Sequence, residues 1–158
     1  MYLHINLINI QGLTETKMLE IQELIDEDSI MCLTETQQKF DKHNIKNDID
    51  KYVCMRNIKS KKGGGLMILK KKKSQVEIED AFTLHEDCMG VKCKFHGFKF
   101  IILNTYYKSN DINNDINQKI GNYLQENEDR AILIMGDFNA HTGQLGEPIN
   151  RNGKLLMD

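Results

Sequence analysis

Apolar residues along this chain follow two spacings, one typical of strands and one typical of helices. Alternation is clearest near the amino terminus, where Leu3, Ile5 and Leu7 share one side with Asn9. Continuous apolar runs predict further strands, and residues 132–135 are typical of a strand buried on both faces. The predicted strands cover residues 3–10, 29–35, 51–57, 66–69, 76–84, 89–95, 98–106 and 131–135.

Two other segments carry apolar residues at helical spacing. In the first, residues 15–27, Thr14 or Thr16 can cap the start. Its apolar face consists of Met18, Ile21, Leu24 and Ile25. In the second, residues 111–127, Ser109 or Asn110 can cap the start. Its apolar face consists of Ile112, Ile116, Ile120, Tyr123 and Leu124. The order of elements predicts an α/β fold, a mixed β-sheet with flanking helices.

The polar segments between these elements are predicted to be loops and turns. Residues 37–50 are predicted to be a surface loop, and His96-Gly97 a turn between two strands. The glycines at 63–65 favour a tight turn or close strand packing, because no helix follows them to bind a phosphate. The lysines at 70–73 are predicted to form a solvated hairpin end, with contact to a DNA backbone as the alternative.

Length and composition predict one globular domain. The chain has 158 residues, of which 40% are hydrophobic and 28% charged. No apolar run approaches the roughly 20 residues that span a bilayer, and no secretory signal begins the chain. We therefore expect an intracellular protein, nuclear or cytoplasmic and not secreted. The formal net charge of −2 does not favour nucleic-acid binding unless lysines and arginines cluster locally.

The four cysteines lie in apolar, strand-like segments, which favours reduced thiols in a reducing compartment. Cys88 and Cys93, flanked by His85 and His96, also form an array with the residue types of a zinc site. Strand alternation argues against zinc, because it sends Cys93 and His96 to opposite faces.

Polar side chains follow four of the predicted strands. Asn9, Glu35 and Tyr106 each end a strand, and Gly136 lets the chain turn before Asp137 and Asn139. Each has an ordinary interpretation: a solvated glutamate, a core tyrosine, or a turn in which Asp and Asn bond their own backbone. Together they predict one site, since phosphodiester hydrolysis needs a cation, a carboxylate to orient water, and neutral donors for the phosphate oxygens.

The residue identities in these segments are more specific evidence than the spacing of their polar positions. Met-Gly-Asp-Phe-Asn-Ala-His-Thr-Gly at 135–143 resembles the Gly-Asp-Phe-Asn motif of the endonuclease/exonuclease/phosphatase superfamily. The similarity is greatest to its branch of non-LTR retrotransposon and apurinic/apyrimidinic endonucleases. Residues 9–13 resemble the first motif of that family, 32–36 the second, and the Asn-x-Tyr segment at 104–106 the third.

The resemblance implies a DNase I-like fold, a partial four-layer α/β sandwich whose second sheet is incomplete. It also implies a role for each matching position. Glu35 would ligate Mg²⁺ or Mn²⁺, and Asn9 would support the metal and the phosphate. Tyr106 would contact the phosphate, Asp137 would orient or activate the nucleophile, and Asn139 would stabilise the transition state.

The sequence departs from the family pattern at several positions. Tyr107-Lys108 replaces the Ala-Pro of many relatives, and the later aspartate and closing Asp-His pair of the family have no counterpart. His141 matches no family histidine and is interpreted as a loop residue, with substrate contact as the alternative. Residues 1–158 are thus predicted to be a single domain truncated at its carboxyl end. A missing carboxyl-terminal half or a reverse transcriptase domain would be its partner.

Two functions follow as hypotheses. The first is an Mg²⁺-dependent DNA endonuclease of the retrotransposon nicking or abasic-site type, with DNA as its partner and no membrane association. The second is a catalytically inactive remnant or interaction module with the same fold. A phospholipid or inositol phosphate hydrolase is less favoured, because the motif wording is closest to the nucleases.

Overall fold

The computed structural model describes residues 2–37, 45–54, 64–108, 114–141 and 147–157. The strands are β1 (His4–Asn9), β2 (Ser29–Thr34), β3 (Ile49–Cys54), β4 (Leu66–Lys71), β5 (Glu77–His85), β6 (Cys88–Phe95), β7 (Phe98–Tyr106) and β8 (Ala131–Asp137). The helices are α1 (Glu15–Glu23), α2 (Asn114–Glu126) and α3 (Arg151–Met157).

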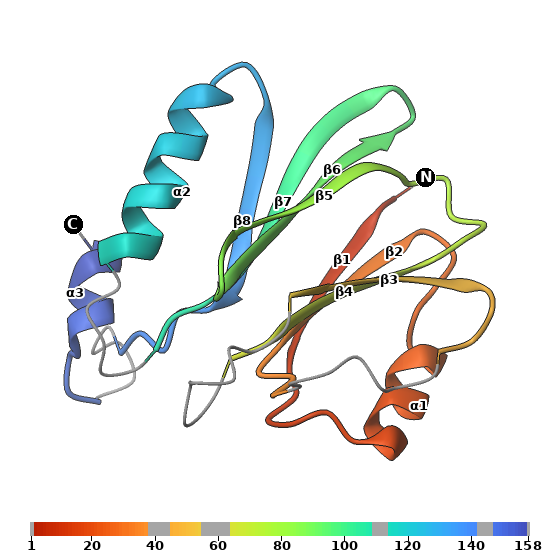
Figure 1. The fold of residues 1–158 in the computed structure, drawn as a ribbon, viewed down its shortest axis with the longest axis horizontal. Helices are drawn as coiled ribbons and strands as arrows, with labels where there is room; N and C mark the ends of the chain where they lie inside the picture. The colour runs from red at the N-terminus through yellow and green to blue at the C-terminus, as the bar shows by residue number, and fades with distance from the viewer. Residues whose placement is uncertain (1, 38–44, 55–63, 109–113, 142–146, 158) are drawn as a thin grey trace.

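The strands form two mixed sheets of four strands each, in the orders β1-β2-β4-β3 and β5-β6-β7-β8 (Figure 1). Each sheet contains one parallel pair, β1 with β2 and β7 with β8, joined through a helix. The remaining neighbours are antiparallel. The predicted α/β class with mixed sheets and flanking helices is confirmed.

Three apolar cores separate four layers, in the order α1, first sheet, second sheet, α2 (Figure 1). The inner core lies between the sheets and includes Ile30, Ile68 and Ile102. One outer core packs α1 on the first sheet, and the other packs α2 on the second. Since both outer faces are covered, β2, β4 and most of β7 are buried on both sides.

Helix α1 starts where the sequence predicts but ends earlier. Thr14 is the N-cap, and its hydroxyl accepts a hydrogen bond from the backbone N–H of Lys17 at 3.3 Å. Met18 and Ile21 are buried as expected, whereas the helix stops at Glu23 and Leu24 is 60% exposed. The predicted extent to residue 27 is wrong, because the helix ends at the C-cap Leu24, whose backbone N–H donates to the Ile21 carbonyl at 3.0 Å.

Helix α2 has the predicted apolar face. Ile116 and Ile120 are buried, and Tyr123 and Leu124 pack on the same core. The predicted caps Ser109 and Asn110, together with Ile112, lie outside the described residues.

Strand β8 is an edge strand rather than the fully buried one predicted from its apolar run. Its only neighbour in the sheet, as far as the described residues show, is β7, and Leu133 is 42% exposed. Ile132, Ile134 and Met135 are half-buried. Among the described residues, the second sheet, which was expected to be incomplete, has four strands with β8 at one edge.

Two predictions in the first sheet are corrected. Strand β3 begins inside the range predicted as loop, with Ile49 buried against the α1 core. Lys70 lies within β4 rather than in a solvated hairpin end and is only 5% exposed. Its ammonium group lies 3.3 Å from a carboxylate oxygen of Asp50 on β3, which compensates for its burial.

The β6–β7 connection is the predicted turn, with His96 and Gly97 at φ values of 48° and 84°. Cys88 belongs to the outer core beneath α2 and Cys93 to the inner core between the sheets. The two thiols lie on opposite faces of one strand and cannot bind the same ion.

Candidate functional site

The two parallel strand pairs bring their carboxyl ends to the same edge of the sandwich. Asn9 ends β1, and its side-chain Nδ2 donates hydrogen bonds to two carboxylates. One is Glu35 Oε1 at 3.0 Å, just after β2. The other is Asp137 Oδ2 at 2.6 Å, at the end of β8. A single amide therefore joins acidic groups from the two sheets, and Asn9 lies 128 positions before Asp137 in the sequence.

The loop after β2 holds Glu35 in an unusual backbone conformation. Glu35 has a φ of 53°, and its carbonyl oxygen accepts a hydrogen bond from Gly12 N at 2.7 Å. The next residues, Thr36 and Gln37, donate backbone hydrogen bonds at 3.0 and 2.9 Å to the carbonyls at 65 and 64. Those glycines have φ values of 84° and 79°, and their carbonyls hold the Glu35 loop close to the start of β4. Gly63, the first glycine of the predicted turn, lies outside the described residues.

Gly136 is required by the approach of β8 to β7. A β-carbon at this position would lie 1.9 Å from the carbonyl oxygen of Thr105, and its φ of 155° suits glycine. Asp137 follows directly, and its Oδ1 accepts a hydrogen bond from the Asn139 backbone N–H at 2.9 Å. Asn139 has a φ of 45°, and its side chain donates to the carbonyl of Tyr107 at 2.7 Å.

Tyr106 ends β7 beside these groups and is only 8% exposed. Burial, followed by the negative charges of Glu35 and Asp137, raises the pKa of its hydroxyl to about 12, although hydrogen bonding to Asn139 opposes the change. The phenol is therefore neutral at physiological pH and can donate a hydrogen bond.

Unfavourable backbone conformations concentrate at this edge. Among the described residues, the non-glycine residues with positive φ are Gln11, Glu35, Gln37, His96 and Asn139. All except His96 lie in the loops that carry the candidate site. Such conformations persist where the surrounding structure fixes them, and they are common at functional sites.

Several polar residues hold this edge together through contacts that the sequence did not predict. Asn104 is fully buried in β7, and its Nδ2 donates across to the first sheet, to the carbonyls of Leu33 at 3.0 Å and Met67 at 3.4 Å. Asn150 and Asn152 donate to the carbonyls of Asn139 and Phe138 at 2.6 and 2.7 Å. Asn104 belongs to the Asn-x-Tyr motif noted in the sequence, and a polar residue inside an apolar run needs a hydrogen-bond partner, but the sequence does not show that the partner lies in the other sheet.

His141 lies in the loop that these asparagines hold. Its backbone N–H donates to Asn150 Oδ1 at 2.9 Å, and its side chain is exposed.

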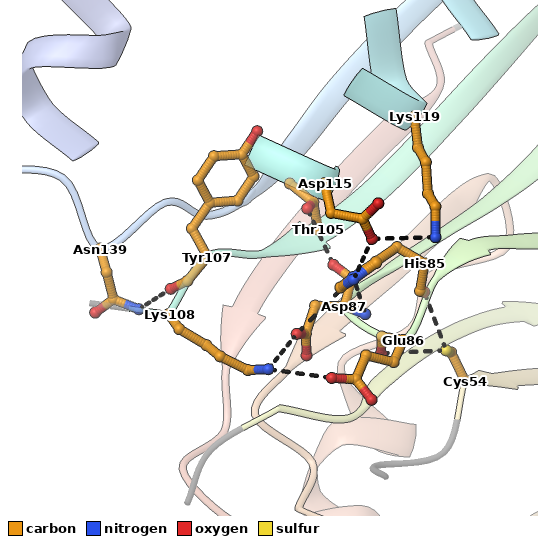
Figure 2. A network of polar contacts seen from close by, with 10 residues as sticks. All are labelled: Cys54, His85, Glu86, Asp87, Thr105, Tyr107, Lys108, Asp115, Lys119 and Asn139. Atoms are coloured by element: carbon orange, nitrogen blue, oxygen red, sulfur yellow. Dashed lines mark hydrogen bonds and ion pairs between the residues drawn. The ribbon is translucent and has the colours of Figure 1, made fainter. Parts of the chain in front are cut away.

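The segment after Tyr106 is linked to the β5–β6 turn by ion pairs. Figure 2 shows Lys108 reaching the β5–β6 turn. There its ammonium nitrogen lies 3.1 Å from Glu86 Oε1 and 3.1 Å from Asp87 Oδ2. Burial raises the pKa of Asp87, and the hydrogen bond and charge of Lys108 oppose that shift.

The donor set at this edge suits a hard divalent cation. In the described ranges, no three His, Cys, Asp or Glu side chains gather as a complete metal site. Two carboxylates and an amide nevertheless converge through Asn9. Mg²⁺ is commonly held by one or two carboxylates together with water and substrate phosphate oxygens, so the Glu35 carboxylate fits such an ion, with Asp137 close by through Asn9.

Two facing mixed sheets, covered by helices and carrying polar side chains at converging strand ends, define a DNase I-like α/β sandwich. A model of the endonuclease/exonuclease/phosphatase family matches residues 7–152. The chain belongs to the endonuclease/exonuclease/phosphatase family.

Solved structures with this fold include the endonuclease domain of TRAS1, a telomere-specific non-LTR retrotransposon. It is 14% identical with a TM-score of 0.69, and the match covers 96% of this chain and 67% of that one. The AP endonuclease LMAP from Leishmania major is 11% identical with a TM-score of 0.67, over 94% and 59% of the two chains. At these identities the likeness shows the fold alone.

A third structure is the 3' phosphatase NExo from Neisseria bound to a product DNA hairpin. It is 15% identical with a TM-score of 0.57, over 90% of this chain and 60% of that one. This chain thus spans about two thirds or less of each of these structures. No curated protein matches it.

None of the helices in the described part of the chain has the length and apolar character needed to cross a lipid bilayer.

Proposed function

We propose that this protein is a metal-dependent phosphodiester hydrolase that cleaves DNA, as an endonuclease of the retrotransposon nicking or abasic-site type. The observation that carries the proposal is the double hydrogen bond of Asn9 to Glu35 and Asp137. It joins two carboxylates and an amide at the meeting point of both sheets. An isolated surface pair of acidic residues would repel, and a bound cation would remove that repulsion.

Glu35, with Asn9 in support, would hold Mg²⁺ or Mn²⁺. Bound there, the ion would neutralise charge that develops on the phosphate oxygens during hydrolysis. The remaining steps belong to the side chains themselves. The Asp137 carboxylate would orient the attacking water and accept its proton, and its position is fixed by hydrogen bonds to both oxygens.

Tyr106 and Asn139 would contact the phosphate. Because the pKa of Tyr106 is raised to about 12, its hydroxyl stays neutral and can donate to a non-bridging oxygen. Asn139 would donate from its amide to the same group as negative charge increases in the transition state. Both side chains carry their donors without adding a titratable charge near pH 7.

DNA is favoured as substrate by the motif resemblance to nucleases, and relatives of the same fold include a retrotransposon endonuclease and a phosphatase bound to a DNA hairpin. The net charge of −2 means that attraction to DNA would come from local lysine groups rather than the whole molecule.

A cleavage assay on supercoiled plasmid and on an abasic-site duplex, with and without Mg²⁺, tests the proposal. We expect nicking that requires the metal. We also expect Glu35→Gln and Asp137→Asn each to lower the rate by roughly 10²-fold or more, as loss of a group acting in the transition state does. Glu79→Gln is the matched control, because that carboxylate pairs with Lys99 at the surface, away from this edge.

The alternative function, an inactive interaction module, makes the opposite prediction. Absence of metal-dependent cleavage on either DNA by the folded wild-type protein would favour it and overturn the hydrolase proposal. Cleavage that survives both substitutions would overturn the roles assigned to Glu35 and Asp137.

A further inference from the structure

Lys108 forms a link between the segment that carries Tyr106 and the β5–β6 turn. It follows Tyr106 by two residues, and its ammonium nitrogen lies 3.1 Å from oxygens of both Glu86 and Asp87 (Figure 2). Its side chain is 30% exposed and that of Asp87 8%, so water screens this pair only in part.

The backbone of the β5–β6 turn also contacts Tyr106 and the residue before it. The carbonyl oxygen of Asp87 accepts hydrogen bonds from the Tyr106 N–H at 2.9 Å and from the Thr105 hydroxyl at 3.0 Å. Asp87 therefore contacts the chain before, at and after Tyr106: through Thr105, through the Tyr106 backbone, and through Lys108.

The β5–β6 turn is itself connected to the first sheet. The Cys54 thiol on β3 lies 3.5 Å from the carbonyl oxygen of Glu86 (Figure 2). A β-carbon on Gly64 would lie 3.0 Å from Asp87 Oδ1, and the Gly64 carbonyl binds the backbone of Gln37 in the Glu35 loop. Asp87 thus sits between the loop of the candidate metal ligand and the strand of Tyr106.

Asn139 depends on the same segment. Its amide donates to the carbonyl of Tyr107 at 2.7 Å, and the carbonyl of Lys108 accepts a hydrogen bond from Asn152 at 3.3 Å. A shift of Tyr107 and Lys108 would therefore displace Tyr106 and Asn139 together.

We propose that Lys108, through its ion pairs with Asp87 and Glu86, is a positioning residue that sets Tyr106 and Asn139 for phosphate contact. This inference rests on the proposed hydrolase function. Lys108 does not touch the reacting atoms and acts through the two side chains it positions.

Kinetics of Lys108→Met, with Lys108→Arg and Lys92→Met for comparison, test the role. Lys92 is the matched control, because its side chain is similarly exposed at 33% and pairs with Asp80 at 3.2 Å on the same sheet. We expect Lys108→Met to lower kcat roughly 10- to 100-fold with KM within about twofold, as misplacement of aligned groups does. Lys108→Arg should recover most of the rate, and Lys92→Met should be unchanged.

A second measurement needs no activity. In protein carrying ¹³C-labelled tyrosine rings, the Tyr106 signal, assigned with Tyr106→Phe, should shift or broaden in Lys108→Met and remain in place in Lys92→Met. An unchanged Tyr106 signal in Lys108→Met overturns the positioning role, as does an unchanged kcat in an active enzyme. Equal losses in Lys108→Met and Lys92→Met also overturn it, because they indicate general destabilisation. If the wild type is inactive, the hydrolase proposal fails, and the tyrosine signal alone decides whether Lys108 positions Tyr106.

Discussion

Tyr106 has its hydroxyl near two acidic side chains and yet remains a neutral donor. Burial and the charges of Glu35 and Asp137 raise its pKa to about 12, above the ordinary value of 10. The negative phenolate is disfavoured in the folded protein by both effects, because it loses water and meets like charges.

This shift has a consequence for stability at alkaline pH. The unfolded chain ionises near pH 10 and the folded one near 12, so folding opposes ionisation and stability falls as pH rises between these values. Because phenylalanine does not ionise, Tyr106→Phe should not show this fall in unfolding free energy at high pH. Relative to wild type, the variant should gain about 1.4 kcal/mol in unfolding free energy between pH 9 and pH 11, measured by urea denaturation. A constant difference across that range would show that the tyrosine is not shielded in this way.

At the scale of elements, Asn104 connects strands that never pair. It lies in β7 of the second sheet and donates to carbonyls of β2 and β4 in the first. The contact lies two residues before Tyr106, so it fixes the distance between the sheets close to the candidate site. A leucine at this position would suit the buried strand but would leave those carbonyls without this donor.

We therefore expect Asn104→Ala to lower the unfolding free energy by roughly 1–3 kcal/mol, the usual effect of leaving buried polar groups unpaired. Asn122→Ala on the exposed surface of α2 is the control and should change it by less than about 0.5 kcal/mol. Equal stability of the two variants in urea denaturation would contradict this role for Asn104.

At the scale of the whole molecule, the reactivity of the cysteine thiols depends on how tightly the apolar cores are packed. All four cysteines are buried and free: Cys32, Cys54, Cys88 and Cys93. Burial raises the pKa of three of them, Cys32, Cys88 and Cys93, to about 12, so they carry almost no thiolate at pH 8.

The native protein should accordingly react with a thiol-specific disulfide reagent far more slowly than the unfolded protein. In denaturant, all four thiols should react at once, because they lie in cores that are lost together when the sandwich unfolds. The absorbance of the released reagent at pH 8 measures the reaction rate of the native protein and that of the unfolded protein. Rapid reaction of one or more thiols in native buffer would show that the cores open independently.

Local sequence patterns predicted the elements well because strand and helix periodicity depends on neighbouring residues. Alternation and apolar runs predicted the β1, β2 and β7 segments, and spacing predicted the apolar face of α2. Motif wording identified the family, which the match over residues 7–152 confirms. The roles assigned to Glu35 and Asp137 remain predictions for the cleavage assay.

The tertiary structure decided which elements lie beside each other, since this depends on pairing between distant segments. An apolar run does not distinguish an edge strand from a central one, so the exposure of Leu133 in β8 was not predicted. Lysine composition alone does not show that Lys70 meets Asp50 on the next strand. The sequence by itself determined the elements and the family, because both depend on the local order of residues. Only the folded chain brought Asn9 to two carboxylates and Lys108 to Asp87, because those contacts exist once the two sheets face each other.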